Sequence, residues 1–160
     1  MNVIGLDLSL TSTGVATQTE TSVLICKLRG YPRLRWIRDA VVERCADADL
    51  VVVEGPSYHS TGSAIHQIAG MWWMVTMAVD EQHPMAVAPP STIKRFATGR
   101  GNADKDAMLL AAARRFDWFD GDNNQADALW ACAMGHEWIK ESIVTLPRTH
   151  RVALDGVAWP

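Results

Sequence analysis

The sequence predicts an α/β domain with a mixed five-stranded sheet flanked by helices on both faces. Three short strand patterns in a row open the chain, which favours an antiparallel meander. A valine-rich run follows that is typical of a strand buried on both faces, and helical and strand patterns alternate after it. With 160 residues, of which 48% are hydrophobic, the chain can bury one compact core.

The N-terminal part of the sequence supplies the meander and the first helix. Strands are expected at residues 2–10, 15–18 and 23–28. Residues 11–14, with two threonines, a serine and a glycine, are expected to form the turn between the first two strands. Pro32 can open a helix whose apolar positions recur at helical spacing as far as Cys45.

The valine-rich stretch at residues 50–56 is expected to form a strand that ends at Glu54. It carries a carboxylate, Glu54, followed at once by the breaker pair Gly55-Pro56. The apolar segment at residues 62–79 is too short to cross a bilayer and is predicted to be a helix with more than one apolar side. Such a helix is expected to pack against the sheet with one side and against a second surface with another side.

The second half of the sequence is predicted to be mainly helical. A strand is expected at residues 85–90, and helices are expected at 91–96, 103–116 and 124–139. Ser91 and Asn102 are the candidate N-caps of the first two of these helices. We expect the compact part to end with the last helix and assign residues 1–140 to one domain. Residues 141–160, with a weak strand pattern at 152–154, form a C-terminal extension without an assigned role.

Cysteine usage and hydropathy indicate a cytoplasmic protein without a membrane partner. The three cysteines, Cys26, Cys45 and Cys132, form no CxxC pair and are expected to be buried thiols. No apolar run reaches the length of a membrane span, and the N-terminus lacks the features of an export signal. We therefore expect the protein to act in the cytoplasm of a bacterium or of a phage-infected host.

The formal net charge of -3 hides two basic stretches. One contains Lys27, Arg29, Arg33, Arg35, Arg38 and Arg44, and the other contains Lys94, Arg95, Arg100, Lys105, Arg114 and Arg115. Each stretch alone could be the solvated face of a helix. Because patches of charge rather than the total decide which partners bind, a nucleic-acid partner remains compatible with this composition.

Three acids occupy positions where solvated side chains are not expected. Asp7 lies in the first strand, Glu54 at the end of the valine strand, and Asp127 between two alanines at the start of the last helix. Strand ends and helix starts converge at one edge of an α/β sheet, so these carboxylates can meet. Clustered carboxylates need cations to stay ionised, and oxygen ligands suit Mg²⁺ or Mn²⁺.

Each acid also has an ordinary structural explanation. Asp127 could complement the helix dipole, and Glu54 could cap the helix that follows it. Asp7 could accept hydrogen bonds from the hydroxyls of the adjacent turn. The three acids together favour a metal site over three separate structural roles.

Four segments in order resemble the RuvC family of Holliday junction resolvases, within the RNase H-like superfamily. They are GLDLSLTSTGVA, VVVEGPSY, APPSTIKRFATGRGNADKDAM and NNQADALWA. The resemblance extends over residues 2–139, and the short form of the chain with its GRGNADKDAM segment is more similar to phage-borne members. It implies an RNase H-like fold.

The resemblance also implies a four-acid nuclease centre with two Mg²⁺ ions per site, for which Mn²⁺ substitutes. Asp7, Glu54 and Asp127 match three of the family's metal ligands. The fourth position falls on Asn124, which keeps the helix face of Asp127 but lacks the charge. Either Asn124 ligates the metal directly, or Asp122, two residues earlier, takes its place.

Basic residues beside the acids are expected to act on the phosphates of the substrate. Lys105, at the start of a helix, is the candidate for stabilising charge on the phosphoryl oxygens. Simple solvation is its alternative role. Lys94 is similar to another basic position of the family, and Arg95 and Arg100 lie in the same stretch. Tyr58 resembles in placement, displaced by one residue, an aromatic that stacks on a base of the opened junction.

Family members act as homodimers, and the apolar helix after the valine strand suits the interface. We expect Met71, Trp72, Met74 and Val75 to form it, with packing against the chain's own sheet as the alternative. A dimer would place two sites against one four-way junction.

The leading functional prediction is a Mg²⁺-dependent endodeoxyribonuclease that resolves four-way DNA junctions symmetrically and leaves 5′-phosphate ends. A less selective RNase H-like nuclease acting on flaps, forks or hybrids is the alternative among enzymes. A junction-binding module without catalysis is a further alternative, supported by Asn124 in an acidic position. An actin-like ATPase would need a second similar domain, for which the chain is too short, so no nucleotide cofactor is expected.

Overall fold

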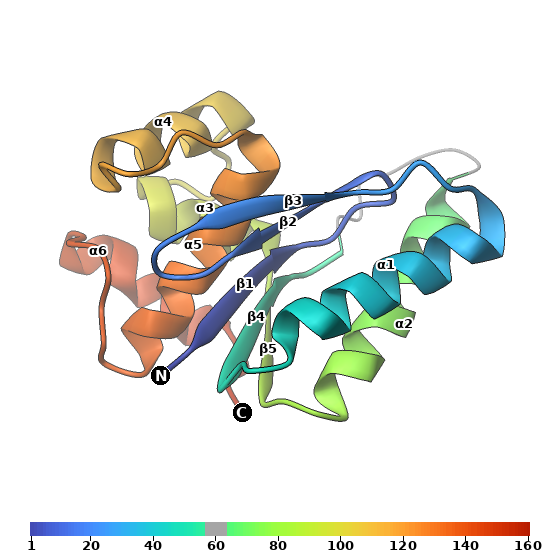
Figure 1. Ribbon diagram of the computed structural model, residues 1–160. Helices are drawn as coiled ribbons and strands as arrows, with labels where there is room; N and C mark the ends of the chain where they lie inside the picture. Colours follow the sequence, from blue (N-terminus) through green and yellow to red (C-terminus); the bar gives the residue numbers. More distant parts are fainter. Residues whose placement is uncertain (57–63) are drawn as a thin grey trace.

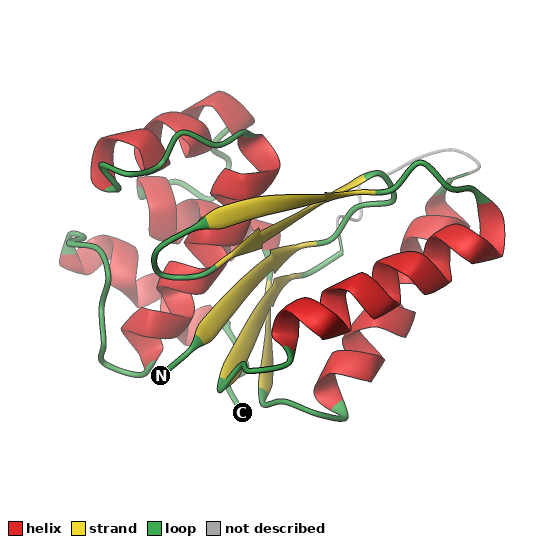
Figure 2. Cartoon of the chain, viewed as in Figure 1, coloured by secondary structure: helices red, strands yellow, loops and turns green. Residues whose placement is uncertain are grey.

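The computed structural model describes residues 1–56 and 64–160 and has an open five-stranded sheet (Figures 1 and 2). The strands are β1 (Val3–Asp7), β2 (Ser12–Ala16), β3 (Thr21–Ile25), β4 (Leu50–Glu54) and β5 (Met85–Ala88). They lie in the order β3-β2-β1-β4-β5. The first three strands form the predicted antiparallel meander, and β4 and β5 continue the sheet in parallel with β1. The predicted mixed α/β sheet is therefore confirmed.

Helices cover both faces of this sheet (Figure 1). The α-helices are α1 (Gly30–Cys45), α2 (Ile65–Asp80), α3 (Pro90–Thr98), α4 (Lys105–Arg115), α5 (Asn123–Trp138) and α6 (Arg148–Arg151), and a 3₁₀ turn, η1 (Val152–Gly156), follows them. Helices α1 and α2 lie on one face, and α5, with α3 and α4 beside it, lies on the other. No helix among the described residues is long and apolar enough to span a bilayer.

The valine strand β4 is buried on both faces, as its composition predicts. Val51 and Val53 pack into the core beneath α1 and α2, whereas Leu50 and Val52 pack into the core beneath α5. Alternate side chains of a strand point to opposite faces, so one apolar run serves both cores.

The three cysteines are buried free thiols, which confirms that prediction too.

Two predicted helix caps are wrong. Helix α3 begins at Pro90, so Ser91 lies inside its first turn and its side chain does not cap the helix. Helix α4 is capped by Asp104, whose backbone is extended and whose carboxylate accepts a hydrogen bond from the Ala107 amide at 2.8 Å. Asn102 lies two residues before that cap. Asp104 is the more favourable N-cap because its charge also complements the positive end of the helix.

Residues 141–160 pack against the main body of the protein. The weak strand pattern at 152–154 is wrong, since the 3₁₀ turn η1 lies there. Leu146, Ala153 and Val157 are buried in the core that lies beneath α3 and α5. The segment also meets α3 directly, where Nδ1 of His150 lies 3.0 Å from the carbonyl oxygen of Phe96. The C-terminal residues therefore support the helix that carries Lys94.

Truncation after Lys140 is expected to destabilise the whole domain. Several buried apolar side chains would be lost and their neighbours on α3 and α5 exposed, and each such side chain contributes roughly 1.5–3 kcal/mol. We expect the free energy of unfolding in urea to fall by at least about 4 kcal/mol. Removing only Pro160, an exposed terminal residue, is the control and should leave stability unchanged. A 1–140 chain as stable as the full chain would contradict the packing described above.

Candidate metal centre

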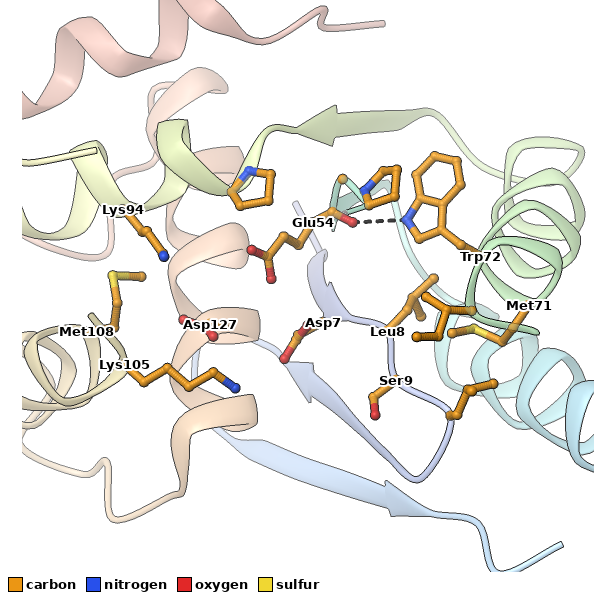
Figure 3. A pocket seen from close by; sticks show the side chains of 15 residues that line it. Asp7, Leu8, Ser9, Glu54, Met71, Trp72, Lys94, Lys105, Met108 and Asp127 are labelled. Carbon is orange, nitrogen blue, oxygen red and sulfur yellow. Dashed lines mark hydrogen bonds between the residues drawn. The ribbon is translucent and has the colours of Figure 1, made fainter. Parts of the chain in front are cut away.

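Three carboxylates from distant parts of the sequence meet at one edge of the sheet. Asp7 ends β1, Glu54 ends β4, and Asp127 lies in the first turns of α5. One carboxylate oxygen of each lies within 4.8 Å of the others, and Figure 3 shows the three side chains around a common space. The positions of these three acids in the sequence predict this group.

Strand register brings Asp7 and Glu54 together. Strands β1 and β4 are parallel neighbours, with Leu6 opposite Val53, so both strands end at the same level. Ser9 and Thr13 hold the turn after β1, since the Ser9 amide donates to Oγ1 of Thr13 at 3.1 Å and that hydroxyl donates to the Ser9 carbonyl oxygen at 3.1 Å.

Two glycines let α5 approach the sheet closely enough to bring Asp127 to the other acids. A Cβ atom on Gly5 would lie 2.0 Å from the carbonyl oxygen of Ala128, and one on Gly14 would lie 2.1 Å from that of Asn124. No side chain fits at these distances, so both positions require glycine. These glycines were missed in the sequence analysis. Gly5 stands in the middle of a strand pattern, which is the signal that could have indicated a close backbone approach. Gly14 was predicted to lie in a turn, whereas the structure places it within β2.

The acids line a cleft of about 420 Å³ between the two helical layers. Lys94 from α3 and Lys105 from the start of α4 line it from one side, and Figure 3 shows their ammonium groups turned toward the acids. Trp72 from α2 lines the opposite side, where its Nε1 donates to the carbonyl oxygen of Glu54 at 3.0 Å. Among the described residues, neither lysine lies within salt-bridge distance of a carboxylate. Space for a ligand therefore separates the acids from the lysines.

Burial and mutual repulsion raise the pKa of all three carboxyl groups. Burial, and after it the charge of Asp127, raises the pKa of Asp7, while burial and the charge of Asp7 raise the pKa of Glu54. Burial and the charge of Glu54 raise the pKa of Asp127 to about 7. Lys105 lowers each of these pKa values but does not offset the rise. The site therefore has excess negative charge when the acids are ionised.

This donor set fits a divalent cation with a preference for oxygen. The ligands are carboxylates from three elements, they converge on one space, and among the described residues no cation of the chain neutralises them within salt-bridge distance. Hard cations such as Mg²⁺ and Mn²⁺ bind through such groups. Asp7, Glu54 and Asp127 would hold the ion.

The two candidates for a fourth ligand differ in their surroundings. Asn124 lies one turn before Asp127 on α5, and its Nδ2 donates to Oγ of Ser12 at 3.1 Å, which leaves the amide oxygen for another partner. Asp122 is exposed and caps α5, where its carboxylate accepts from the Gln125 amide at 3.0 Å. Asp122 is not among the acids whose oxygens converge.

The two arginines predicted to contact DNA, Arg95 and Arg100, are not among the residues that line the cleft. Arg95 on α3 and Arg100 in the loop after it are exposed on the same side of the site as Lys94. Tyr58 lies outside the described residues. The basic surface around the acids thus includes two lysines within the cleft and two arginines beyond it.

Most of the α2 residues that were predicted to form a dimer interface are buried in the core. Met71 and Val75 have no exposed surface, and Trp72 is only 7% exposed, because all three pack against β1, β4 and α1. Of the predicted set, Met74 alone is partly exposed. The most exposed of the large apolar side chains on α2 are Trp73 and Met77, at 68% and 61%. A partner that binds this helix would therefore contact Trp73 and Met77, since Met71 and Val75 are inaccessible.

The raised pKa values make the stability of the metal-free protein depend on pH. The folded state holds protons on these acids that the unfolded chain has already released. The contribution of these acids to stability is therefore fully present below about pH 4 and is lost as the pH rises through about 7. Between pH 5.5 and 8 in EDTA, we expect the free energy of unfolding to fall by at least about 1 kcal/mol. Asp127→Asn should flatten this dependence, and Mg²⁺ should stabilise the protein more at pH 8 than at pH 6. An unchanged slope in Asp127→Asn would contradict this assignment.

Comparison with known proteins identifies solved structures with a similar fold. No protein-family model matches the sequence, and the comparison with curated proteins found no match. The fold is RNase H-like, and two solved structures are similar to it. Thermus thermophilus RuvC superposes with a TM-score of 0.69 at 18% identity, covering 91% of this chain and 100% of that one. T. thermophilus RuvC in complex with a Holliday junction substrate gives 0.69 at 17%, covering 91% and 99%. The chain therefore has a RuvC-like fold.

Proposed function

We propose that this protein is a metal-dependent, structure-selective endonuclease that resolves four-way DNA junctions by paired phosphodiester hydrolysis and leaves 5′-phosphate ends. The convergence of Asp7, Glu54 and Asp127 in a cleft that also contains two lysines carries the proposal. The RuvC-like fold supports it, because one of the similar structures holds a Holliday junction substrate. Such an enzyme would act in the bacterial or phage-infected cytoplasm, where its DNA substrate lies.

The residues of the cleft have complementary roles in this chemistry. Two Mg²⁺ ions held by the acids, with Mn²⁺ as a substitute, would polarise the scissile phosphate and lower the pKa of a water molecule. Lys105 and Lys94 face the acids across the cleft and would stabilise the negative charge that develops on the phosphoryl oxygens. Arg95 and Arg100 would bind the DNA backbone outside the cleft.

Symmetric cutting requires two copies of the site, and we propose that the protein acts as a homodimer. The exposed side chains of Trp73 and Met77 lie one helical turn apart on α2 and offer an apolar contact. Trp73→Ser with Met77→Ser should produce a monomer that binds junctions and loses paired cutting. If sedimentation shows that the double variant is still a dimer, the interface lies elsewhere.

A panel of DNA substrates tests the proposed activity. The wild-type protein is incubated in Mg²⁺ with an end-labelled four-way junction, a fork, a flap, an RNA–DNA hybrid and a linear duplex of matched sequence. We expect paired nicks in the four-way junction at a rate at least about tenfold above any other substrate, a difference of about 1.4 kcal/mol in activation free energy. Equal cutting of forks, flaps or hybrids would favour the less selective nuclease. Junction binding without cutting in either Mg²⁺ or Mn²⁺ would favour a binding module.

Exchanging charges at the fourth position distinguishes its two candidates. Asn124→Asp adds a carboxylate beside the other acids, and we expect it to tighten Mg²⁺ binding by about tenfold through added attraction. Asp122→Asn should retain full cleavage, since asparagine also caps helices well. Calorimetric titration with Mg²⁺ and single-turnover cleavage measure both effects. Loss of metal binding in Asp122→Asn, with the fold intact, would identify Asp122 as the ligand instead.

A further inference from the structure

A second basic surface remains unused by the proposed chemistry. The segment at residues 21–38 contains five cations and no acid. It extends from β3 through the first two turns of α1. Lys27, Arg29 and Arg35 are exposed, and we call these three side chains, together with the half-buried Arg33, the α1 basic surface.

The charges of this surface are not compensated within the described chain. Arg38 pairs with Asp39 at 2.6 Å, but no member of the α1 basic surface lies within salt-bridge distance of a described carboxylate. The first turn of α1 also lacks an acidic residue. Helix N-termini favour acids, and cations there are unfavourable by roughly 0.3–1 kcal/mol. A cluster of cations at this place conflicts with local stability, and such conflicts are typical of functional surfaces.

The α1 basic surface lies at the same edge of the sheet as the acids. The Cys26 amide donates to the carbonyl oxygen of Thr11 at 3.0 Å, in the turn that begins directly after Asp7. Lys27 follows Cys26, so the basic segment starts beside the turn that lines the cleft. Helix α1 then runs away from this edge and ends near the start of β4 (Figure 1).

The two basic surfaces lie on opposite sides of the acids. Lys94 and Lys105 come from α3 and α4, which lie on one face of the sheet, whereas α1, which carries Arg33 and Arg35, lies on the other face (Figure 1). A DNA strand held at the acids would continue past both. Tyr31, which is 78% exposed in the first turn of α1, adds an aromatic ring on which an unpaired base could stack.

We infer that the α1 basic surface binds the sugar–phosphate backbone of a DNA arm beyond the cleavage point, on the side of the acids opposite to Lys94 and Lys105. This inference rests on the proposed function for the identity of the substrate. Its partner is a polyanion with regularly spaced phosphates, which complements a cluster of exposed cations without local acids. The surface would set affinity and orientation and would take no part in the chemical step.

The test removes three charges from this surface and compares the result with the loss of three charges elsewhere. The surface variant is Lys27→Gln with Arg29→Gln and Arg35→Gln, all at exposed positions. Arg33 is left intact because its Nε donates to the carbonyl oxygen of Leu28 at 2.5 Å. The control variant is Arg44→Gln with Lys140→Gln and Arg148→Gln, which are also exposed and lie away from this segment. Circular dichroism checks that both variants are folded.

Binding of a labelled four-way junction is measured by fluorescence anisotropy in EDTA over a range of salt concentrations. We expect the surface variant to bind about tenfold or more weakly than wild type near 0.1 M salt. The slope of log K against log[salt] should become less steep by about 2 to 3, since each phosphate contact contributes about 0.9. Single-turnover cleavage at saturating DNA should stay within about twofold of wild type, because the acids are unchanged.

The outcomes separate this inference from the proposed function. If the surface variant keeps the wild-type affinity and slope, or if the control variant loses as much, the inference is wrong even when junction cleavage is intact. If wild type binds DNA through this surface but cuts no branched substrate, the inference holds and the proposed function is wrong. If the surface variant instead loses only its retention on vesicles containing an anionic phospholipid, the partner is a membrane surface and the inference is overturned. A wild-type protein that binds no DNA at all overturns both.

Discussion

Asp7→Asn is expected to reduce cleavage of a four-way junction by at least about 10³-fold, or roughly 4 kcal/mol of transition-state stabilisation. Asp7 lies beside both Glu54 and Asp127, so a neutral amide there weakens the hold on the divalent ion that the chemistry requires. Junction binding should persist, since the variant removes a negative charge from a site that must accept phosphate. Single-turnover cleavage and anisotropy measure the two effects separately.

The matched control is Asp80→Asn, an exposed acid at the end of α2 that lies outside the cleft. It should cut and bind like wild type. The Asp7→Asn protein should also be at least as stable as wild type at pH 8 without metal, because burial raises the pKa of the Asp7 carboxyl and ionising it costs stability. Retained cutting by Asp7→Asn would show that the metal site lies elsewhere.

Gly5→Ala is expected to have the largest effect on the fold. The added Cβ would lie 2.0 Å from the carbonyl oxygen of Ala128 and 2.4 Å from the amide nitrogen of Cys132, both of them backbone atoms of α5. The helix would have to move away from the sheet and would carry Asp127 with it. We expect a loss of at least about 4 kcal/mol in the free energy of unfolding, measured in urea, or a protein that does not fold.

Gly70→Ala supplies the control for this glycine. Gly70 lies within the exposed stretch of α2, and a Cβ there would meet nothing within 4 Å. Alanine favours the helix over glycine by up to about 1 kcal/mol, so this variant should be slightly more stable than wild type. A folded Gly5→Ala protein with normal stability would show that α5 does not approach β1 as described.

Local sequence patterns were sufficient to predict the sheet and the acids. The meander follows from alternating strand and turn signals, and the burial of β4 follows from its valines. Asp7 and Glu54 end their strands, so their meeting needed only parallel neighbours. Each strand, and the place of each acid at its strand end, depends on residues close together in the sequence and can be predicted without a structure, whereas the pairing of β1 with β4 joins distant segments.

Features that depend on packing between distant segments could not be predicted in the same way. The close approach of α5 to β1 depends on Gly5, whose role is visible only once the helix is in place. The side of α2 that stays exposed depends on α1 and the sheet, so Met71 and Val75 were assigned to an interface although they are buried. Leu146 and Val157 lie in a segment with little periodicity, and only contact with the core buries them. Assignment to a phage-type branch stays a prediction.

The central claim is that Asp7, Glu54 and Asp127 together hold the divalent ions of a nuclease. Anomalous diffraction from crystals of the wild-type protein grown with Mn²⁺ tests it most directly, because the signal locates the ion without reference to activity. We expect manganese peaks in contact with these three carboxylates and no such peaks in Asp7→Asn crystals. Well-ordered wild-type carboxylates without manganese between them, at millimolar Mn²⁺ and pH 8, would contradict it.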